Sequence, residues 1–265
     1  MAKRTPNQNR IKGDSIVRFG VHQIVQHILM FSSFAILAVT GLPMKYRNTA
    51  GSEWFMGLMG GPDTVSAVHH VAAWVMVGAC AYHLAYLVFS VVVLRRPFPT
   101  SMLPRIKDAR DFVQDMKHTF GLSSETPRYD RFSYRNKGAY WLVLTGAFIT
   151  VGSGLLLMYP GWTATHLAGW MNPLALVIHS DAAILAVGWM VIVHLYFAHL
   201  SAHIFPMDKS IFTGRVPVER YRVEFPLEFE RIVAAAEAAE TEAVEPQREM
   251  RPGLQMSSEL SETAS

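Results

Sequence analysis

Residues 173–205 read PLALVIHSDAAILAVGWMVIVHLYFAHLSAHIF, an apolar run that also carries ionisable side chains. A helix needs roughly 20 apolar residues to cross a bilayer, so this run is long enough to span a membrane. Ionisable side chains are costly at membrane depth, which makes each of them a candidate functional residue. The ionisable residues of this run are His179, Asp181, His194, His199 and His203.

His179 and His194 are 15 residues apart. At about 100° per helical residue, this separation places them within roughly 60° of one face. At about 1.5 Å per residue, it places them roughly 22 Å apart along the helix axis. Two ligands on one face at two depths suit two haems stacked across a membrane, whereas a metal cluster needs ligands that converge on one point.

Three further apolar stretches accompany this one in a chain of 265 residues that is 51% hydrophobic and 17% charged. Each is long enough to span, so the sequence predicts an all-α integral membrane four-helix bundle. The expected spans are residues 19–42, 65–94, 140–159 and 173–205. Around this transmembrane domain at 19–205, we expect an N-terminal arm at 1–18 and a tail at 206–265 that is partly helical and then disordered.

Some classes of protein are excluded by composition. Cys80 is the only cysteine, so a disulfide framework and an iron–sulfur site made by this chain alone are both excluded. The first 18 residues are polar and the apolar run after them is longer than the hydrophobic region of a signal peptide. We therefore expect no cleaved leader.

Lysine and arginine concentrate in residues 1–18, in residues 95–137 and after residue 206. The loop between the first two spans holds only Lys45 and Arg47. Because cytoplasmic loops carry an excess of basic residues, we expect both termini and the middle loop to be cytoplasmic. The net charge of +3 follows from this asymmetry and does not indicate nucleic-acid binding.

The middle loop contains IKDARDFVQDMKHTF at residues 106–120. Its apolar residues recur at helical spacing, which predicts an amphipathic surface helix on the inner leaflet. The residues of this stripe are Ile106, Phe112, Val113, Met116 and Phe120.

A weak internal repeat relates the two halves of the transmembrane domain. AVTGLPMKY at 38–46 resembles TVGSGLLLMY at 150–159, and HHVAA at 69–73 resembles HSDAA at 179–183. The repeat matches His69 to His179 and predicts two helical hairpins related by duplication.

Helix direction and depth sort the histidines into two levels. His69 and His179 lie near the outer ends of the second and fourth spans, and His69 is preferred to His70 because it shares a face with His83. The inner level holds His22, His27, His83 and His194. A bis-histidine haem needs imidazoles from two facing helices, so the sequence predicts an outer haem and an inner haem.

Other functions are compatible with the same residues. Zinc usually takes three or four convergent ligands, which only the inner histidines offer. A proton relay through Asp181 and the histidines is a further alternative. So is a haem-free membrane anchor or proton-conducting subunit that holds other subunits.

The sequence resembles the membrane cytochrome b subunit of respiratory formate dehydrogenases, which is related to the cytochrome b of nickel–iron hydrogenases and of thiosulfate reductase. The resemblance covers Arg18–Pro206, nearly all four spans. The matching stretches are His27 with the TG of AVTGLP, VHHVAAW, RFSYRNKGAYW, VIHSDAA and VHLYFAHL.

This resemblance implies two b haems, the outer held by His69 and His179 and the inner by His27 and His194. It implies a quinone site beside the inner haem, and an electron-transfer subunit rather than a catalytic one. The implied partners are an iron–sulfur or multihaem electron-transfer subunit, a catalytic subunit, the quinone pool and membrane lipid.

The sequence departs from the family pattern at His83, which the formate dehydrogenase subunit lacks, and in the His179–His194 spacing of 15, where 14 is usual. In the cytochrome b of bc-type complexes, both haems sit between the second and fourth helices. That arrangement makes His83 the alternative partner of His194. A third haem, held by His83 with His22 or His199, is a further alternative.

Overall fold

The four apolar stretches form the long helices of the fold. The computed structural model describes residues 10–95, 102–201 and 204–249. The helices long and apolar enough to cross a membrane are Val21–Lys45, Pro62–Val92, Tyr134–Met158 and Met171–Leu200. In the most apolar 18 residues of each of these helices, at most 11% of the residues are buried. Because these apolar surfaces face outward, the helices suit lipid surroundings, and the predicted all-α membrane bundle is confirmed.

The helix ends differ from the expected spans by a few residues, and two of the differences have a clear cause. The first span, α1 (Val21–Lys45), runs through Gly41 and Pro43, where the sequence predicted its end. Pro43 lies in the last turn, so the lost backbone N–H and the ring affect only the end of the helix. The third span, α5 (Tyr134–Met158), begins before the expected residue 140 because a polar turn precedes its apolar part.

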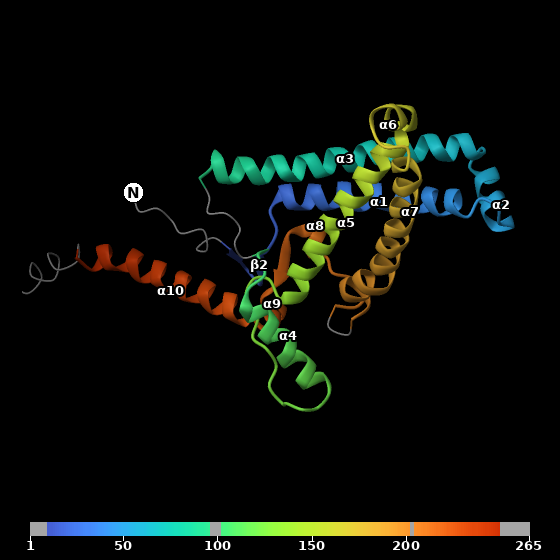
Figure 1. Cartoon of the computed structure of the whole chain (residues 1–265). Helices are drawn as coiled ribbons and strands as arrows, with labels where there is room; N and C mark the ends of the chain where they lie inside the picture. The colour runs from blue at the N-terminus through green and yellow to red at the C-terminus, as the bar shows by residue number, and fades with distance from the viewer. Residues whose placement is uncertain (1–9, 96–101, 202–203, 250–265) are drawn as a thin grey trace, which may run out of the picture. The chain divides into compact units, whose positions relative to one another are not determined.

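The spans pair as two hairpins. Helix α1 packs along α3 (Pro62–Val92), and α5 packs along α7 (Met171–Trp189) (Figure 1). Helix α1 also contacts α7, and α3 contacts α5. This pairing is the arrangement of two hairpins that the internal repeat predicted.

A short helix lies in the connection between the two spans of each hairpin. This helix is α2 (Ala50–Leu58) in the first hairpin and α6 (Pro160–His166) in the second. After α2, Gly60 and Gly61 adopt φ values of +92° and +99°, a conformation that side chains with a Cβ rarely take. Pro62 then starts α3 at a position where its missing N–H costs nothing.

Small side chains fill the seam between α1 and α3. Ser33 and Thr40 of α1 and Ala72 and Ala79 of α3 are all buried. Small residues let membrane helices approach closely, which is the main source of their packing energy in lipid. The Ser33 hydroxyl donates to the carbonyl of Leu29 at 2.8 Å, so its burial leaves no unpaired donor.

The fourth span passes from α-helix into π-helix after α7. The π-helical segments are η2 (Met190–His194) and η3 (Tyr196–Leu200). A π turn holds one residue more than an α turn, and such turns are frequent at functional sites. The short helix α8 (Ser210–Thr213) follows this span.

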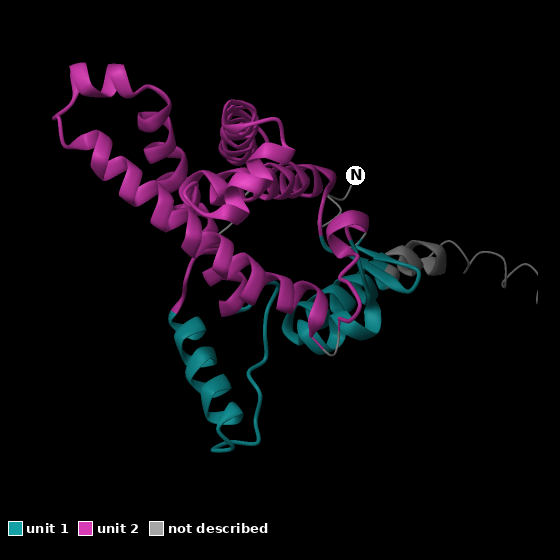
Figure 2. Cartoon of the chain, turned by 90° about the vertical axis from the view of Figure 1, so that its right-hand side faces the viewer, with its two compact units in different colours: residues 1–18, 106–133, 215–265 teal, residues 19–105, 134–214 magenta. Residues whose placement is uncertain are grey.

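The chain divides into two compact units (Figure 2). The transmembrane unit contains residues 19–105 and 134–214, and the extramembrane unit contains residues 1–18, 106–133 and 215–265. The three segments of the extramembrane unit precede α1, join α3 to α5, and follow the fourth span.

A three-stranded antiparallel sheet organises the extramembrane unit. Its strands are β1 (Ile11–Lys12), β2 (Ser15–Val17) and β3 (Arg215–Pro217), in that order. Helices α4 (Ile106–Thr119), α9 (Val218–Glu224) and α10 (Pro226–Glu249) complete the unit. Its apolar core consists of Ile16, Val216, Tyr221, Phe225 and Ile232.

A buried polar cluster joins the N-terminal arm to the tail. The Arg10 guanidinium pairs with the Glu228 carboxylate and donates to the Tyr221 hydroxyl at 3.0 Å. The Tyr221 hydroxyl in turn donates to Glu228, and burial raises the pKa of Tyr221. Each buried polar group therefore has a partner, which such a cluster needs in order to stabilise the fold.

Candidate functional site

Two pairs of histidine rings face each other in the transmembrane unit. His69 of α3 and His179 of α7 have ring centroids 6.4 Å apart and planes at 77°. His27 of α1 and His194 of η2 have centroids 6.3 Å apart and planes at 34°. The fold thus brings together the two pairs that the family resemblance implied.

The separations fit two imidazoles that share one iron. A metal–imidazole nitrogen bond is about 2 Å, and that nitrogen lies about 1 Å from the ring centre, so two imidazoles on opposite faces of one metal have centroids roughly 6 Å apart. Each of the four rings is partly buried, as an axial ligand inside a bundle would be. The residues present therefore fit a haem at each pair.

Glycines lie against both rings of the outer pair. A Cβ added to Gly41 would lie 3.1 Å from Cε1 of His69, and one added to Gly154 would lie 3.0 Å from Cε1 of His179. Either position is tighter than nearly all real Cβ contacts. The absence of a side chain at each glycine is therefore what lets the ring lie against the neighbouring helix.

A backbone carbonyl sets the proton position on His179. Its Nδ1 lies 2.9 Å from the carbonyl oxygen of Thr150, which can only accept, so Nδ1 carries the hydrogen. The Ser153 hydroxyl lies 3.3 Å from the same nitrogen. Metal-binding histidines usually donate their second ring N–H in this way, which leaves Nε2 free to bind the metal.

His69 has the matching arrangement in the other hairpin. Its Nδ1 lies 2.8 Å from the Thr40 hydroxyl, which itself lies 2.7 Å from the carbonyl oxygen of Ile36. Because that hydroxyl donates to the carbonyl, it accepts from Nδ1–H of His69. The repeat aligns Thr40–Gly41 with Ser153–Gly154, so both outer histidines meet a hydroxyl and a glycine at equivalent positions.

The π turn accounts for the unusual spacing on the fourth span. His179 and His194 are 15 residues apart, one more than His69 and His83. His194 is the last residue of η2, where the wider turn accommodates the extra residue. The ring of Trp189 lies 5.7 Å from that of His194. His194 thereby faces His27 despite the insertion.

His83 makes two hydrogen bonds instead of facing His194. Its Nδ1 lies 3.0 Å from Oε1 of Gln26, and its Nε2 lies 3.0 Å from the Tyr140 hydroxyl. Both ring nitrogens are therefore engaged, one by α1 and one by α5. The Nε2 donor of Gln26 is buried without a partner among the described residues.

The remaining histidines lie in different surroundings. His22 contacts the Tyr82 hydroxyl at 2.7 Å and stacks on Tyr86 at 4.7 Å. His166 stacks on Trp162 at 4.8 Å. His70 and His118 are exposed, His199 is partly buried in η3, and His203 lies outside the described residues.

The other predicted ionisable residue, Asp181, pairs with Lys45. The Lys45 ammonium lies 2.7 Å from the carboxylate and 2.9 Å from the Ser180 hydroxyl, linking α1 to α7. Within residues 10–95, 102–201 and 204–249, no three His, Cys, Asp or Glu side chains gather as a metal site. Zinc needs such a group.

Sequence reasoning missed the residues that hydrogen-bond the histidines. Thr40 and Ser153 are hydroxyls one position before repeat-related glycines, a signal that the repeat contained. Gln26 and Tyr140 gave no signal, because each meets His83 from a different helix.

Comparison with known proteins agrees with this geometry. The family described as prokaryotic cytochrome b561 matches residues 18–214, which is most of the chain and includes every span. No curated protein matches the chain. With its four apolar spans and paired histidines, the chain belongs to the prokaryotic cytochrome b561 family, whose members are haem b electron-transfer proteins of the membrane.

Proposed function

We propose that this chain is the di-haem membrane subunit of a respiratory oxidoreductase complex and exchanges electrons with the quinone pool. The observation that carries the proposal is the pair of centroid separations, 6.4 and 6.3 Å, at two levels of one bundle. A bound haem b supplies one-electron redox chemistry. The chain would supply the histidine nitrogens that hold the haems, the apolar surroundings and the groups that handle protons.

His69 and His179 would hold the outer haem, and His27 and His194 would hold the inner haem. His83 is proposed to have another role, because its two ring nitrogens are already bonded to Gln26 and Tyr140. A third haem held by Nε2 of His83 would require the hydrogen bond from the Tyr140 hydroxyl to break, whereas the bond from Nδ1 to Gln26 could remain.

A quinone site beside the inner pair is proposed from the polar groups around His83. Reducing a quinone requires protons as well as electrons, and an imidazole that shares hydrogen bonds with a phenol hydroxyl and an amide can pass protons to a substrate. The Gln26 oxygen accepts from Nδ1 of His83, so Nε2 accepts from the Tyr140 hydroxyl. The unpaired Gln26 Nε2 is a donor that a quinone oxygen can accept from.

The proposed setting is the bacterial inner membrane, with both termini cytoplasmic. The basic residues of the three extramembrane segments support this orientation. We propose that an iron–sulfur or multihaem electron-transfer subunit and a catalytic subunit complete the complex, because the described residues gather no group of three metal-binding side chains besides the two histidine pairs.

Haem content in single alanine variants tests the proposal. We expect two haems b per chain by pyridine haemochrome assay. Replacing His69, His179, His27 or His194 should each remove one of them. His83→Ala should retain both, with His166→Ala as the control at the end of α6. Loss of a haem in His83→Ala together with retention in His27→Ala would instead support the bc-type arrangement.

A further inference from the structure

Helix α4 exposes apolar residues along one line. Ile106, Val113 and Phe120 follow one another at intervals of seven residues, which at about 100° per residue keeps them within roughly 40° of each other. Their exposed fractions are 76%, 51% and 75%; Phe120 directly follows the helix, and Leu122 after it is 77% exposed. A helix in a soluble protein would bury such a stripe.

The chain covers the polar face of the same helix. Lys107 pairs with Asp111 at 2.6 Å and donates to the carbonyl of Arg128 at 3.0 Å. Gln114 donates to the carbonyl of Glu125 at 2.9 Å. The loop that follows α4 therefore folds back over its polar side, leaving the apolar side uncovered.

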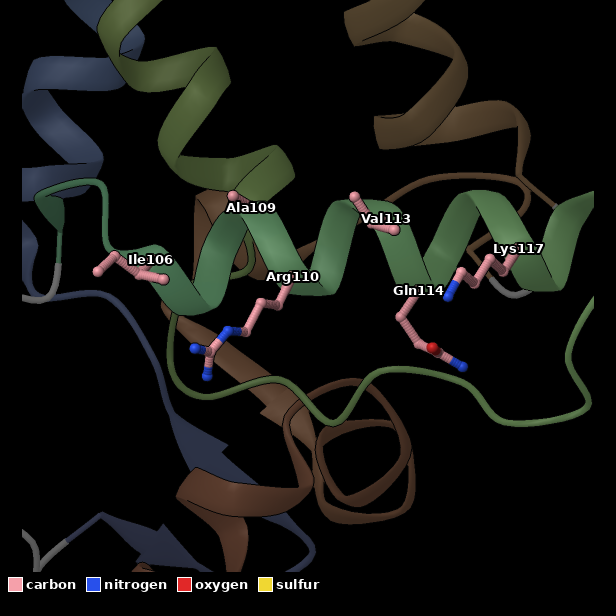
Figure 3. Close-up of a pocket in the computed structure, with 6 residues that line it drawn as sticks. All are labelled: Ile106, Ala109, Arg110, Val113, Gln114 and Lys117. Atoms are coloured by element: carbon pink, nitrogen blue, oxygen red, sulfur yellow. The ribbon is translucent and has the colours of Figure 1, made fainter.

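Charge is also divided between the two faces. On the same angular scale, Arg110 and Lys117 lie within roughly 40° of Ile106, whereas the acidic residues lie roughly 140–200° away. These acidic residues are Asp108, Asp111 and Asp115. A shallow groove combines apolar and basic residues. Its lining residues, drawn in Figure 3, are Ile106, Ala109, Arg110, Val113, Gln114 and Lys117.

We propose that the apolar face of α4 inserts into the headgroup region of the bilayer, where Arg110 and Lys117 contact anionic lipid headgroups. Residues 106–133 join α3 to α5, so both ends of this segment are tethered to membrane spans. An apolar stripe bordered by basic residues, with the acids on the far face, matches the charge pattern of helices that lie in an anionic interface. The inference does not depend on the haem or quinone assignments.

Depth-dependent fluorescence quenching in proteoliposomes tests the contact with lipid. In a Cys80→Ala background of the full chain, a bimane probe is attached at Val113→Cys. His118→Cys, exposed on another face of the same helix, is the matched control. An unchanged haem spectrum verifies that each variant folds.

Lipids with a nitroxide near the headgroup should quench the probe at Val113→Cys at least about twofold more than the probe at His118→Cys. The charge reversal Arg110→Glu with Lys117→Glu should reduce that quenching in vesicles containing phosphatidylglycerol. It should leave the quenching unchanged in pure phosphatidylcholine. Equal quenching at the two positions would overturn the proposal. So would protection of the Val113 probe by co-purifying subunits instead of lipid.

Discussion

The outer and inner histidine pairs have nearly equal ring separations, yet their surroundings differ. His69 and His179 each donate Nδ1–H to an oxygen on a neighbouring helix and lie against a glycine. Within the described part of the chain, no hydrogen bond reaches the ring nitrogens of His27 or His194. Polar bonding at the inner level centres on His83, which is not a member of either pair.

Under the proposed function, the outer level would hold a cofactor and the inner level would also exchange protons. Hydrogen bonds to the second nitrogen fix the orientation of a ligating ring and raise its basicity. The outer level has those bonds on both rings, as suits a haem that only passes electrons. At the inner level, the His83 imidazole contacts the Tyr140 hydroxyl and the Gln26 amide. Such a group would suit a site where a substrate gains or loses protons.

The largest expected effect is at His83. His83→Ala should lower quinol-driven haem reduction by about 10²-fold, because general acid–base groups typically contribute at least that much. Stopped-flow reduction with a soluble quinol analogue measures this rate. Haem content should not change, and chemical reduction with dithionite should be complete. A normal rate would mean that the inner network has no part in proton transfer and that the contrast between the levels is structural only.

The next largest effect is expected at Gly154, the glycine that lies against the His179 ring of the outer pair. Gly154→Ala would place a Cβ 3.0 Å from the His179 ring, and overpacking of this kind costs about 1–3 kcal/mol. We expect partial loss of one haem on purification, read from the haem-to-protein ratio.

Gly152→Ala on the same helix is the matched control, since no atom lies within 4 Å of its added Cβ. It should retain both haems. Equal losses in the two variants would show that the helix, and not the His179 ring, is sensitive to added volume.

A smaller effect is expected at Thr40. Thr40→Ala removes the acceptor for Nδ1–H of His69, and losses of such second partners typically lower metal affinity about 10-fold or more. Haem transfer to apomyoglobin measures the change in the release rate. Thr40→Ser keeps the hydroxyl and should restore slow release. Failure of serine to do so would assign the effect to lost packing between α1 and α3.

The smallest effect is expected at Tyr140. Tyr140→Phe removes one hydroxyl donor to His83 and preserves the ring, at a cost of about 1 kcal/mol for one hydrogen bond. The quinol-driven rate should fall several-fold, with both haems present. A shift in the pH dependence of that rate should accompany the loss. If the pH profile is unaltered, Tyr140 acts only as packing beside His83.

The extramembrane unit was not foreseen from the sequence. Its arm, middle loop and tail read as separate polar segments, because strands as short as β1 give too few residues for an alternating pattern. The unit arises from contacts between residues 200 or more positions apart, such as Arg10 with Glu228 and Ile16 with Val216. Sequence periodicity reports only on neighbours along the chain and carries no information about such pairs.

In the transmembrane unit, the sequence by itself determined the four spans and the two levels of histidines. Apolar length and helical periodicity are local properties, and a membrane leaves the backbone little choice but helix. Tertiary structure decided which rings meet. His27 and His83 lie at similar depth, and only the packing of α1, α3, α5 and α7 turns one toward His194 and the other toward Gln26 and Tyr140. The depth of a histidine in the membrane follows from counting residues along its helix. The direction in which its ring points depends on how neighbouring helices are rotated against one another.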